Sequence, residues 1–397
     1  MRDVAFLGTW NSAVTSYYVL LGATLLLLAI GLVMVLSSSS VESLAAGKSP
    51  YAVFLNQARY ALIGLPVLIV ASRLPLRVVR AAAWPALGAA VVFQLLVFTP
   101  LGCGEGGNRN WVCVPGFQAQ PSEAVKLALA IWLGVVLARK LPLLREWKHA
   151  LVPAAPVALV AIGAVLAGHD LGTAMVLVML VAGAMFVAGV PLRIFGVAGL
   201  AAAGGVAVLA IGSENRMNRI MSWLAAECDV TNECYQPLHA GYGLATGGVS
   251  GVGLGQSAEK WSYLPAAHND FIYAILGEEL GLVGTLLVLG LFALLAFAMI
   301  RIMRRHTDPF VKITTGAIFG WVIGQAVVNI AVVIGLAPVI GVPLPLVSAG
   351  GSALIMTMAA LGLLLSFART EPGAAQALAA RPSVVRRSLA VIGRTRG

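Results

Sequence analysis

The chain has 397 residues, of which 59% are hydrophobic and only 11% are charged. This balance excludes an ordinary soluble domain and is typical of helical bundles embedded in a membrane. The net charge of +10 predicts attraction to anionic lipid and argues against nucleic-acid binding, because the cations gather where cytoplasmic loops are expected.

Apolar runs of roughly 20 residues, the length that crosses a bilayer, predict an all-α polytopic membrane protein with about ten transmembrane helices. Residues 1–16 would form a cytoplasmic N-terminal segment, residues 17–370 the membrane domain, and residues 371–397 a disordered, basic cytoplasmic tail. The first run is too long for a signal-peptide core, so we interpret it as a retained anchor. The spans are expected near residues 17–36, 52–72, 81–101, 120–138, 150–167, 171–189, 195–212, 271–300, 313–334 and 352–368.

The basic residues predict the orientation. With a cytoplasmic N-terminus, most of the 26 Lys and Arg residues fall on the inner side, notably at residues 73–80, 139–148 and 301–312 and in the tail. Cytoplasmic loops carry such an excess of basic residues. Both termini are therefore expected to be cytoplasmic.

All four cysteines fall in segments that this orientation places outside, where disulfides persist. They are Cys103, Cys113, Cys228 and Cys234. Four cysteines allow three pairings, and loop proximity favours Cys103 with Cys113 and Cys228 with Cys234. A metal site is the alternative interpretation, although no paired histidines lie nearby in the sequence.

Three outer segments are long enough to hold a functional site. Residues 102–119 contain several glycines and the cluster NRNW, so we expect a flexible, polar and aromatic loop. Residues 213–270 form the largest outer loop, and their aromatic residues argue against disorder. Residues 335–352 contain three prolines and repeated glycines, which predict an irregular segment packed against protein, since lipid would not satisfy its backbone.

Asp270 is the leading candidate for chemistry, because it lies between the largest outer loop and the apolar run FIYAILG. A carboxylate at the membrane boundary can act as a general base if a substrate hydroxyl comes within hydrogen-bond reach. The simpler interpretation is that Asp270 is the N-cap of a helix. The two roles are compatible.

Glu123 and Lys126 lie three residues apart and share one face of the fourth span. Pro121 and Glu123 also fit an ordinary helix start. Lys126, however, lies deeper among apolar residues, where an ion usually faces a partner or a cavity. We therefore expect the pair to organise a site.

Other polar residues are weaker candidates. Arg59 is either a functional intramembrane ion or part of a buried hydrogen-bond network with the nearby Asn56 and Gln57. Asp170 is expected to cap the sixth span. The outer cations Arg216, Arg219 and Lys260 are either solvated or available to bind a pyrophosphate.

Several long motifs occur in a recognisable order. They are MVLSSSSVESL, NRNWVCVPGFQAQPSEAVKLAL, HDLGTA, QPLHAGYGLATGGVSGVGLGQSAEKWSYLPAAHNDFIYAILGEELG and PLPLVSAGGSALI. On these motifs the sequence resembles the SEDS family of shape, elongation, division and sporulation proteins over nearly all of residues 17–370. The opening VLSSSSVES and the ending ALGLLLSFARTEP are more similar to the division branch than to the elongation branch.

The resemblance implies a peptidoglycan glycosyltransferase that polymerises lipid II and releases undecaprenyl pyrophosphate. Its catalytic aspartate would fall on Asp270, and the glutamate and lysine of its QPSExxK motif fall on Glu123 and Lys126. Further candidates for binding substrate or organising the site are Arg59, Arg109, Arg216, Arg219, Lys260, His268 and Ser348.

The same resemblance implies a place and partners. The protein would lie in the bacterial plasma membrane, with its site on the extracytoplasmic face, at the division septum. A class B penicillin-binding protein would supply the transpeptidase, and further division proteins would join it. The sequence departs from the family where His169 replaces a usual proline, and its two outer cysteine pairs are not a general family feature.

The implied reaction joins an α-linked donor into a β-linked product and therefore inverts the anomeric carbon. It requires a base beside the acceptor 4-hydroxyl and charge stabilisation at the leaving pyrophosphate. We assign Asp270 as the base. Lys126, Arg216 or Arg219, with a divalent ion such as Mg²⁺ or Mn²⁺, could stabilise the leaving group, and Glu123 could keep Lys126 charged.

Two other functions stay open at this point. A transporter or flippase of the lipid-linked precursor would need a charged pathway across the whole bilayer, whereas Glu123, Lys126, Asp170 and Asp270 are all expected toward the outer face. A non-catalytic division scaffold is the third alternative. The placement of the acidic residues favours chemistry at the outer surface.

Overall fold

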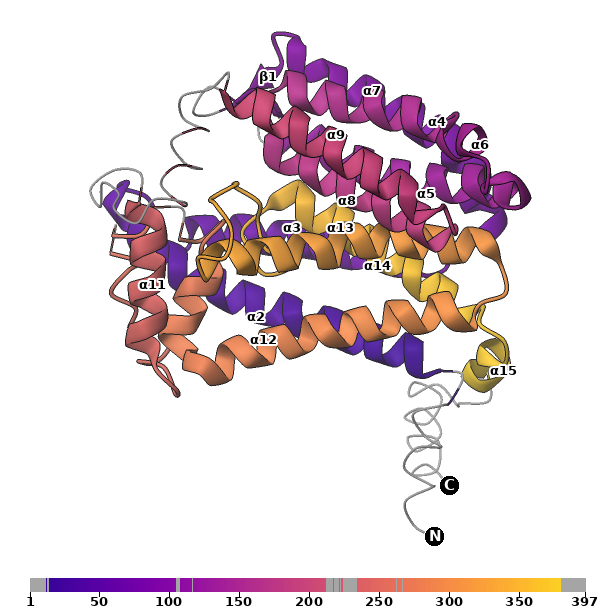
Figure 1. Ribbon diagram of the computed structural model, residues 1–397. Helices are drawn as coiled ribbons and strands as arrows, with labels where there is room; N and C mark the ends of the chain where they lie inside the picture. Colours follow the sequence, from indigo (N-terminus) through magenta and orange to yellow (C-terminus); the bar gives the residue numbers. More distant parts are fainter. Residues whose placement is uncertain are drawn as a thin grey trace, which may run out of the picture.

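The computed structural model describes residues 12, 14–104, 108–115, 117–211, 217, 221, 223, 234–261, 263–265 and 267–379. Long helices run side by side in a bundle, with short elements at its two ends (Figure 1). The helices are α2 (Thr15–Ala45), α3 (Ala52–Ala71), α4 (Leu76–Leu95), α5 (Pro121–Lys140), α6 (Trp147–Leu151), α7 (Ala154–Ala167), α8 (Leu171–Val187), α9 (Leu192–Ile211), α11 (Tyr235–Gly247), α12 (Ile272–Arg305), α13 (Pro309–Val333), α14 (Gly351–Arg369) and α15 (Ala374–Ala379).

Each predicted span coincides with one of the long helices. Seven helices in the described part of the chain are long and apolar enough to cross a membrane, and α8 is a shorter apolar helix. These features confirm a helical, multi-pass membrane protein. The count of ten spans stays a prediction.

The two ends of the bundle carry different elements. The first outer segment and α11 lie at one end, whereas α6 and α15 lie at the other (Figure 1). Segments that the charge pattern places outside therefore share one end, and segments that it places inside share the opposite end. This arrangement agrees with the expected topology.

The core forms where helices distant in the sequence pack together: α13 contacts α8 and α5, α14 contacts α3, and α12 contacts α2. Between α8 and α13 the backbones approach closely, because a Cβ on Gly183 would collide with the Gly316 carbonyl. A Cβ on Gly320 would collide with the carbonyl of Met179. Small residues at such contacts are typical of helix pairs in membranes.

A bend at Gly281 divides α12 into residues 272–280 and 282–305. Gly281 has φ 65° and ψ −162°, a conformation that glycine adopts far more readily than other residues. The glycine-rich loop after α11 fits into the bend, where the carbonyl of Gly248 accepts a hydrogen bond from the N–H of Leu282 at 2.9 Å. The bend thus joins α12 to the segment that precedes Asp270.

Residues 102–119 are more ordered than the sequence analysis expects. Their described part forms an antiparallel sheet in the order β1 (Gly102–Cys103), β2 (Trp111–Val114) and β3 (Phe117–Ala119). Cys103 lies opposite Trp111, and Cys113 opposite Gln118. A disulfide joins Cys103 to Cys113, so the expected flexible loop is wrong for these residues.

The other cysteines can be placed only in part. Cys234 is disulfide-bonded, whereas Cys228 lies outside the described residues. The candidate cations Arg216 and Arg219 also lie outside them, as does most of the basic tail.

Residues 335–350 have the irregular, packed structure that the sequence predicts. They contain no helix or strand, and they bury Val342, Leu344, Leu346 and Val347. The segment therefore packs against the protein through these four residues, whereas Gly335, Leu336 and Gly341 are exposed.

At the inner end, Glu371 follows α14 and its side chain is fully buried. Its Oε2 lies 3.5 Å from Nε of Arg305. Burial raises the pKa of the Glu371 carboxyl, and Arg301 and Arg305 oppose this shift in part.

The raised pKa of Glu371 predicts a stability that falls as the pH rises. The folded protein holds this proton more tightly than the unfolded chain, so the stabilisation is complete below the ordinary pKa of 4.5 and is lost as the pH passes the raised pKa. Relative to Glu371→Gln, which does not titrate, the thermal midpoint of the parent in detergent should fall as the pH rises above about 4.5 and through the raised pKa of Glu371. A midpoint difference that stays constant, or that grows in favour of the parent, would contradict this assignment.

Candidate active site

A cavity of about 1230 Å³ lies at the end of the bundle that carries β1 and the first turns of α5 and α8. Its volume exceeds that of typical small-molecule pockets, so it can hold a larger substrate. The lining residues come from α3, the outer hairpin, the first turns of α5 and α8, the second half of α13, residues 268–270 and residues 337–353. The cavity brings Glu123, Lys126, Asp170 and Asp270 together.

Asp270 is half-buried and lines this cavity. The helix α12 begins at Ile272, and its N-cap residue is Phe271, with no side-chain capping bond. The capping interpretation of Asp270 is therefore wrong, because the helix starts one residue later than that interpretation requires. A Cβ placed on Gly341 would lie 3.6 Å from Asp270 Oδ2, so the carboxylate lies close to the irregular segment.

Side chains from α13 hold the backbone around Asp270. Asn329 Nδ2 donates to the carbonyls of Asp270 and Val342, at 2.8 Å each. One turn away, Gln325 Nε2 donates to the carbonyl of Pro343 at 2.8 Å. These bonds fix the Asp270 backbone and the irregular segment to the same helix.

Ser348 joins the same two segments from the other side. Its Oγ donates to the carbonyl of Asn269 at 2.7 Å and accepts from the N–H of Leu344 at 2.8 Å. Ser348 is buried and is absent from the lining of the large cavity. In this structure it organises the wall of the cavity.

Glu123 and Lys126 form a buried ion pair in the first turns of α5. Lys126 Nζ lies 2.8 Å from Glu123 Oε1, and the two side chains are 2% and 4% exposed. The ammonium also donates to Gln325 Oε1 at 3.3 Å and lies 5.0 Å from the centre of the Trp321 ring. Pro121 occupies the first turn, as expected for the start of this helix. The cation is thus held by a carboxylate, an amide and an aromatic face.

Asp170 caps α8, as the sequence predicts, and accepts from the N–H of Thr173 at 2.9 Å. Its second oxygen accepts from Thr173 Oγ1 at 2.8 Å, Gln120 Nε2 at 2.9 Å and Asn110 Nδ2 at 3.2 Å. Asp170 therefore ties the outer hairpin and the start of α5 to α8. It has a larger structural role than a cap.

The remaining candidates lie in different places. His268 lines the cavity, and its Nδ1 lies 2.9 Å from Glu42 Oε2. The guanidinium of Arg109 donates a hydrogen bond to the carbonyl of Thr99 at 2.9 Å. Arg59 is exposed on α3, so the interpretation that it belongs to a buried hydrogen-bond network is wrong. Gln57 is the buried polar residue of this helix, and it forms hydrogen bonds with the backbone of Ser348 and Gly350.

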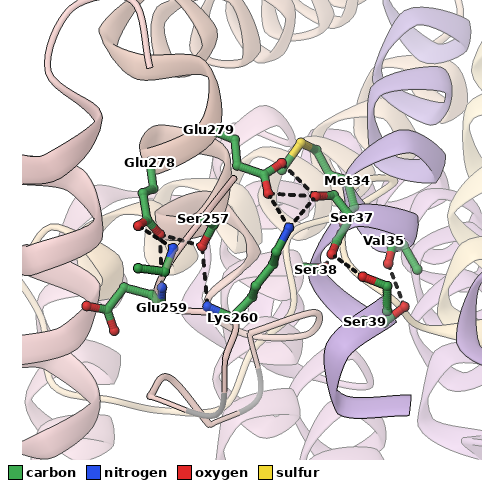
Figure 2. A network of polar contacts seen from close by, with 12 residues as sticks. Met34, Val35, Ser37, Ser38, Ser39, Ser257, Glu259, Lys260, Glu278 and Glu279 are labelled. Carbon is green, nitrogen blue, oxygen red and sulfur yellow. Dashed lines mark hydrogen bonds and ion pairs between the residues drawn. The ribbon is translucent and has the colours of Figure 1, made fainter. Parts of the chain in front are cut away.

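Lys260 lies in a second polar network away from the cavity lining (Figure 2). Its Nζ lies 3.1 Å from Glu279 Oε1, and Ser37 on α2 donates to the same carboxylate at 2.6 Å. Both charged side chains are buried. Lys260 therefore braces the loop before Asp270, and the structure does not bring it to the position expected of a pyrophosphate ligand.

The neighbouring Glu278 completes this brace (Figure 2). It accepts hydrogen bonds from the Ser257 hydroxyl and from the N–H of Ala258 at 2.8 Å. Glu278 and Glu279, beside the bend of α12, thus fix the loop of residues 257–260 through contacts with both its side chains and its backbone.

Three further residues of the site, Gln120, Gln325 and Asn329, are not among those predicted from the sequence. The last two stand four residues apart on an apolar helix, so they share one face, and polar residues within a span usually face the protein interior. This spacing is the signal that could have found them. No comparable signal exists for Gln120, because its partner Asp170 lies 50 residues away.

Within the described residues, no group of three His, Cys, Asp or Glu side chains could hold a metal ion. Glu123 Oε2 has no hydrogen-bond partner in the described part of the chain. Mg²⁺ is usually bound by one or two carboxylates together with substrate phosphates, so the cavity could contribute such oxygens only with substrate present.

Removing Lys126 alone should destabilise the protein more than removing both charges of the pair. Lys126→Met leaves a buried carboxylate without its cation, at a cost of about 3–5 kcal/mol, whereas Glu123→Gln/Lys126→Met leaves no buried charge. We expect the thermal midpoint in detergent to fall for the single variant and to recover in the double variant. Glu146→Gln, at an exposed inner position, is the control, and equal losses in the single and double variants would refute the electrostatic coupling.

Residues 18–372 match the protein family described as cell cycle protein, which takes in FtsW, RodA and SpoVE. The "Probable peptidoglycan glycosyltransferase FtsW" of Mycobacterium tuberculosis is 41% identical over 375 residues, which cover 94% of this chain and 72% of that protein. Stage V sporulation protein E of Bacillus subtilis is 35% identical over 349 residues, which cover 87% of this chain and 95% of that protein.

Solved structures share the fold. The rod shape determining protein RodA of Thermus thermophilus is 27% identical, with a TM-score of 0.67 over 89% of this chain and 97% of that chain. A chain from a structure described as "Structural coordination of polymerization and crosslinking by a peptidoglycan synthase complex" is also 27% identical, with a TM-score of 0.72 over 88% of this chain and 96% of that chain. The chain therefore belongs to the cell cycle protein family of FtsW, RodA and SpoVE, the SEDS family whose motifs its sequence carries.

Proposed function

We propose that this protein is a peptidoglycan glycosyltransferase that polymerises lipid II into glycan strands during septal wall synthesis. The observation that carries the proposal is the large outer cavity, which Asp270 and the Glu123–Lys126 pair line together. Family membership and the activity named for the Mycobacterium tuberculosis relative support it. The site would lie on the extracytoplasmic face of the bacterial plasma membrane.

In this reaction Asp270 acts as the general base. The acceptor 4-hydroxyl attacks the anomeric carbon of the donor and transfers its proton to the Asp270 carboxylate. The electron pair of the breaking carbon–oxygen bond leaves with the lipid pyrophosphate, and the configuration at the anomeric carbon inverts. Because Asn329 and Ser348 fix the backbone of residues 269 and 270, the base is held in place before substrate arrives.

Lys126 supplies positive charge to the same cavity. A cation near the departing pyrophosphate stabilises the negative charge that develops in the transition state. Glu123 and Gln325 hold the ammonium in position. Arg216 and Arg219 stay candidates for the same role from outside the described residues.

The proposed partners follow from the family and from the related synthase complex. A class B penicillin-binding protein would crosslink the strands that this protein polymerises, and other division proteins would recruit the pair to the septum. Membrane lipid surrounds the apolar helices, and the polyprenyl chain of the substrate would remain in it while the sugar enters the cavity.

Asp270→Asn should abolish polymerisation while the protein remains folded. A general base contributes about 100-fold or more to the rate, so we expect a loss of at least that size with labelled lipid II and a transpeptidase partner present. Asp308→Asn is the matched control, because Asp308 caps α13 far from the cavity and asparagine also caps helices.

Two results would contradict the proposal. Polymerisation by Asp270→Asn at the parent rate would refute the base assignment. A parent protein that moves lipid II between the leaflets of a liposome without making polymer would instead support the transporter alternative.

A further inference from the structure

The outer hairpin forms one wall of the cavity, and a disulfide closes it. Cys103 and Cys113 both line the cavity, together with Asn108, Asn110 and Trp111 from the loop between them. The cross-link is thus part of the cavity wall.

Adjacent residues within the disulfide loop dock onto the turn between α7 and α8. The N–H of Arg109 donates to the carbonyl of Gly168 at 3.0 Å, and Asn110 Nδ2 donates to Asp170 Oδ2 at 3.2 Å. The loop therefore reaches the carboxylate that also binds Gln120 at the start of α5. Moving the loop would disturb the part of the wall that Asp170 and Gln120 form, whereas Lys126 keeps its own contacts with Glu123 and Gln325.

Backbone pairing alone holds this hairpin weakly. The strand β1 has two residues and β3 has three, and small sheets of short strands are marginally stable without further packing. A disulfide across a sequence separation of 10 residues removes many conformations that the undocked loop would otherwise sample. The cross-link therefore increases the fraction of molecules in which Asn110 is hydrogen-bonded to Asp170.

We propose that the Cys103–Cys113 disulfide is a positioning element for substrate binding, so that this protein needs an oxidised hairpin to bind lipid II well. The inference rests on the proposed function. Reduction by a dithiol would convert the disulfide to two thiols, while the dithiol is oxidised to its own disulfide. The hairpin lacks the base and the cation, so its loosening weakens binding of the sugar and leaves the chemical step intact.

The test is the kinetics of lipid II polymerisation with and without dithiothreitol. In the oxidised parent, reduction should raise KM about tenfold, or about 1.4 kcal/mol, with little change in kcat, and reoxidation should restore KM. Cys103→Ser/Cys113→Ser should show the raised KM from the start and no further response to dithiothreitol. A merely structural cross-link would change the thermal midpoint without this selective effect on KM.

Asn110→Ala keeps the disulfide and removes the bond to Asp170, so it should raise KM by a similar factor even if the cysteine variant folds poorly. Val114→Thr is the matched control and should keep the kinetics of the parent, because Val114 lies at the exposed end of β2 and outside the cavity lining.

Several outcomes would overturn the inference. Parent-like KM in both Asn110→Ala and the double cysteine variant would do so, as would a loss in kcat at unchanged KM. Dithiothreitol sensitivity that persists in the double variant would assign the effect to the disulfide of Cys234. A parent that makes no polymer when oxidised contradicts the proposed function itself, whereas equal polymerisation by parent and variants contradicts this inference alone.

Discussion

Side-chain amides hold the irregular backbone on which the candidate site is built. Residues 335–350 place peptide groups inside the protein without a helix to satisfy them, and an unpaired buried peptide group is costly. Gln57, Gln325 and Asn329 supply the missing partners from two helices. Asn329 also binds the carbonyl of Asp270. The side chains that satisfy the peptide groups of this segment therefore also fix the position of the proposed base.

The cavity separates its charges between two walls. Asp270 lies with the irregular segment, whereas the Lys126 ammonium lies on α5 within a buried ion pair. An ion pair in such a place adds little net stability, because desolvation offsets its attraction. In the proposed reaction, its value is a fixed cation near the departing pyrophosphate. In that reaction a proton passes to the Asp270 carboxylate and negative charge develops on a pyrophosphate oxygen. A base on one side and a cation on the other suit these two changes.

The sequence predicts most of the helices, because an apolar run of membrane length has few alternatives. It also singles out Asp270 and Lys126, since an ion in or beside an apolar span requires an explanation. It could not predict the bonds of Asn329, which join segments 59 residues apart, nor the burial of Lys260 against Glu279. It offers Asp270 as a helix cap, one residue before the observed N-cap, and it wrongly predicts that the disulfide hairpin is a flexible loop. The contacts of Asn329 and Lys260 join separate segments, which local patterns do not encode.

If Asp270 is the base, it must face a cavity that opens to the outer side of the membrane and that substrate occupies. Sided labelling of Asp270→Cys tests it, with the parent as the control for its native cysteines. A membrane-impermeant maleimide should label the variant in right-side-out vesicles, and added lipid II should slow the labelling. Labelling only from the cytoplasmic side, or labelling that lipid II does not affect, would contradict the account.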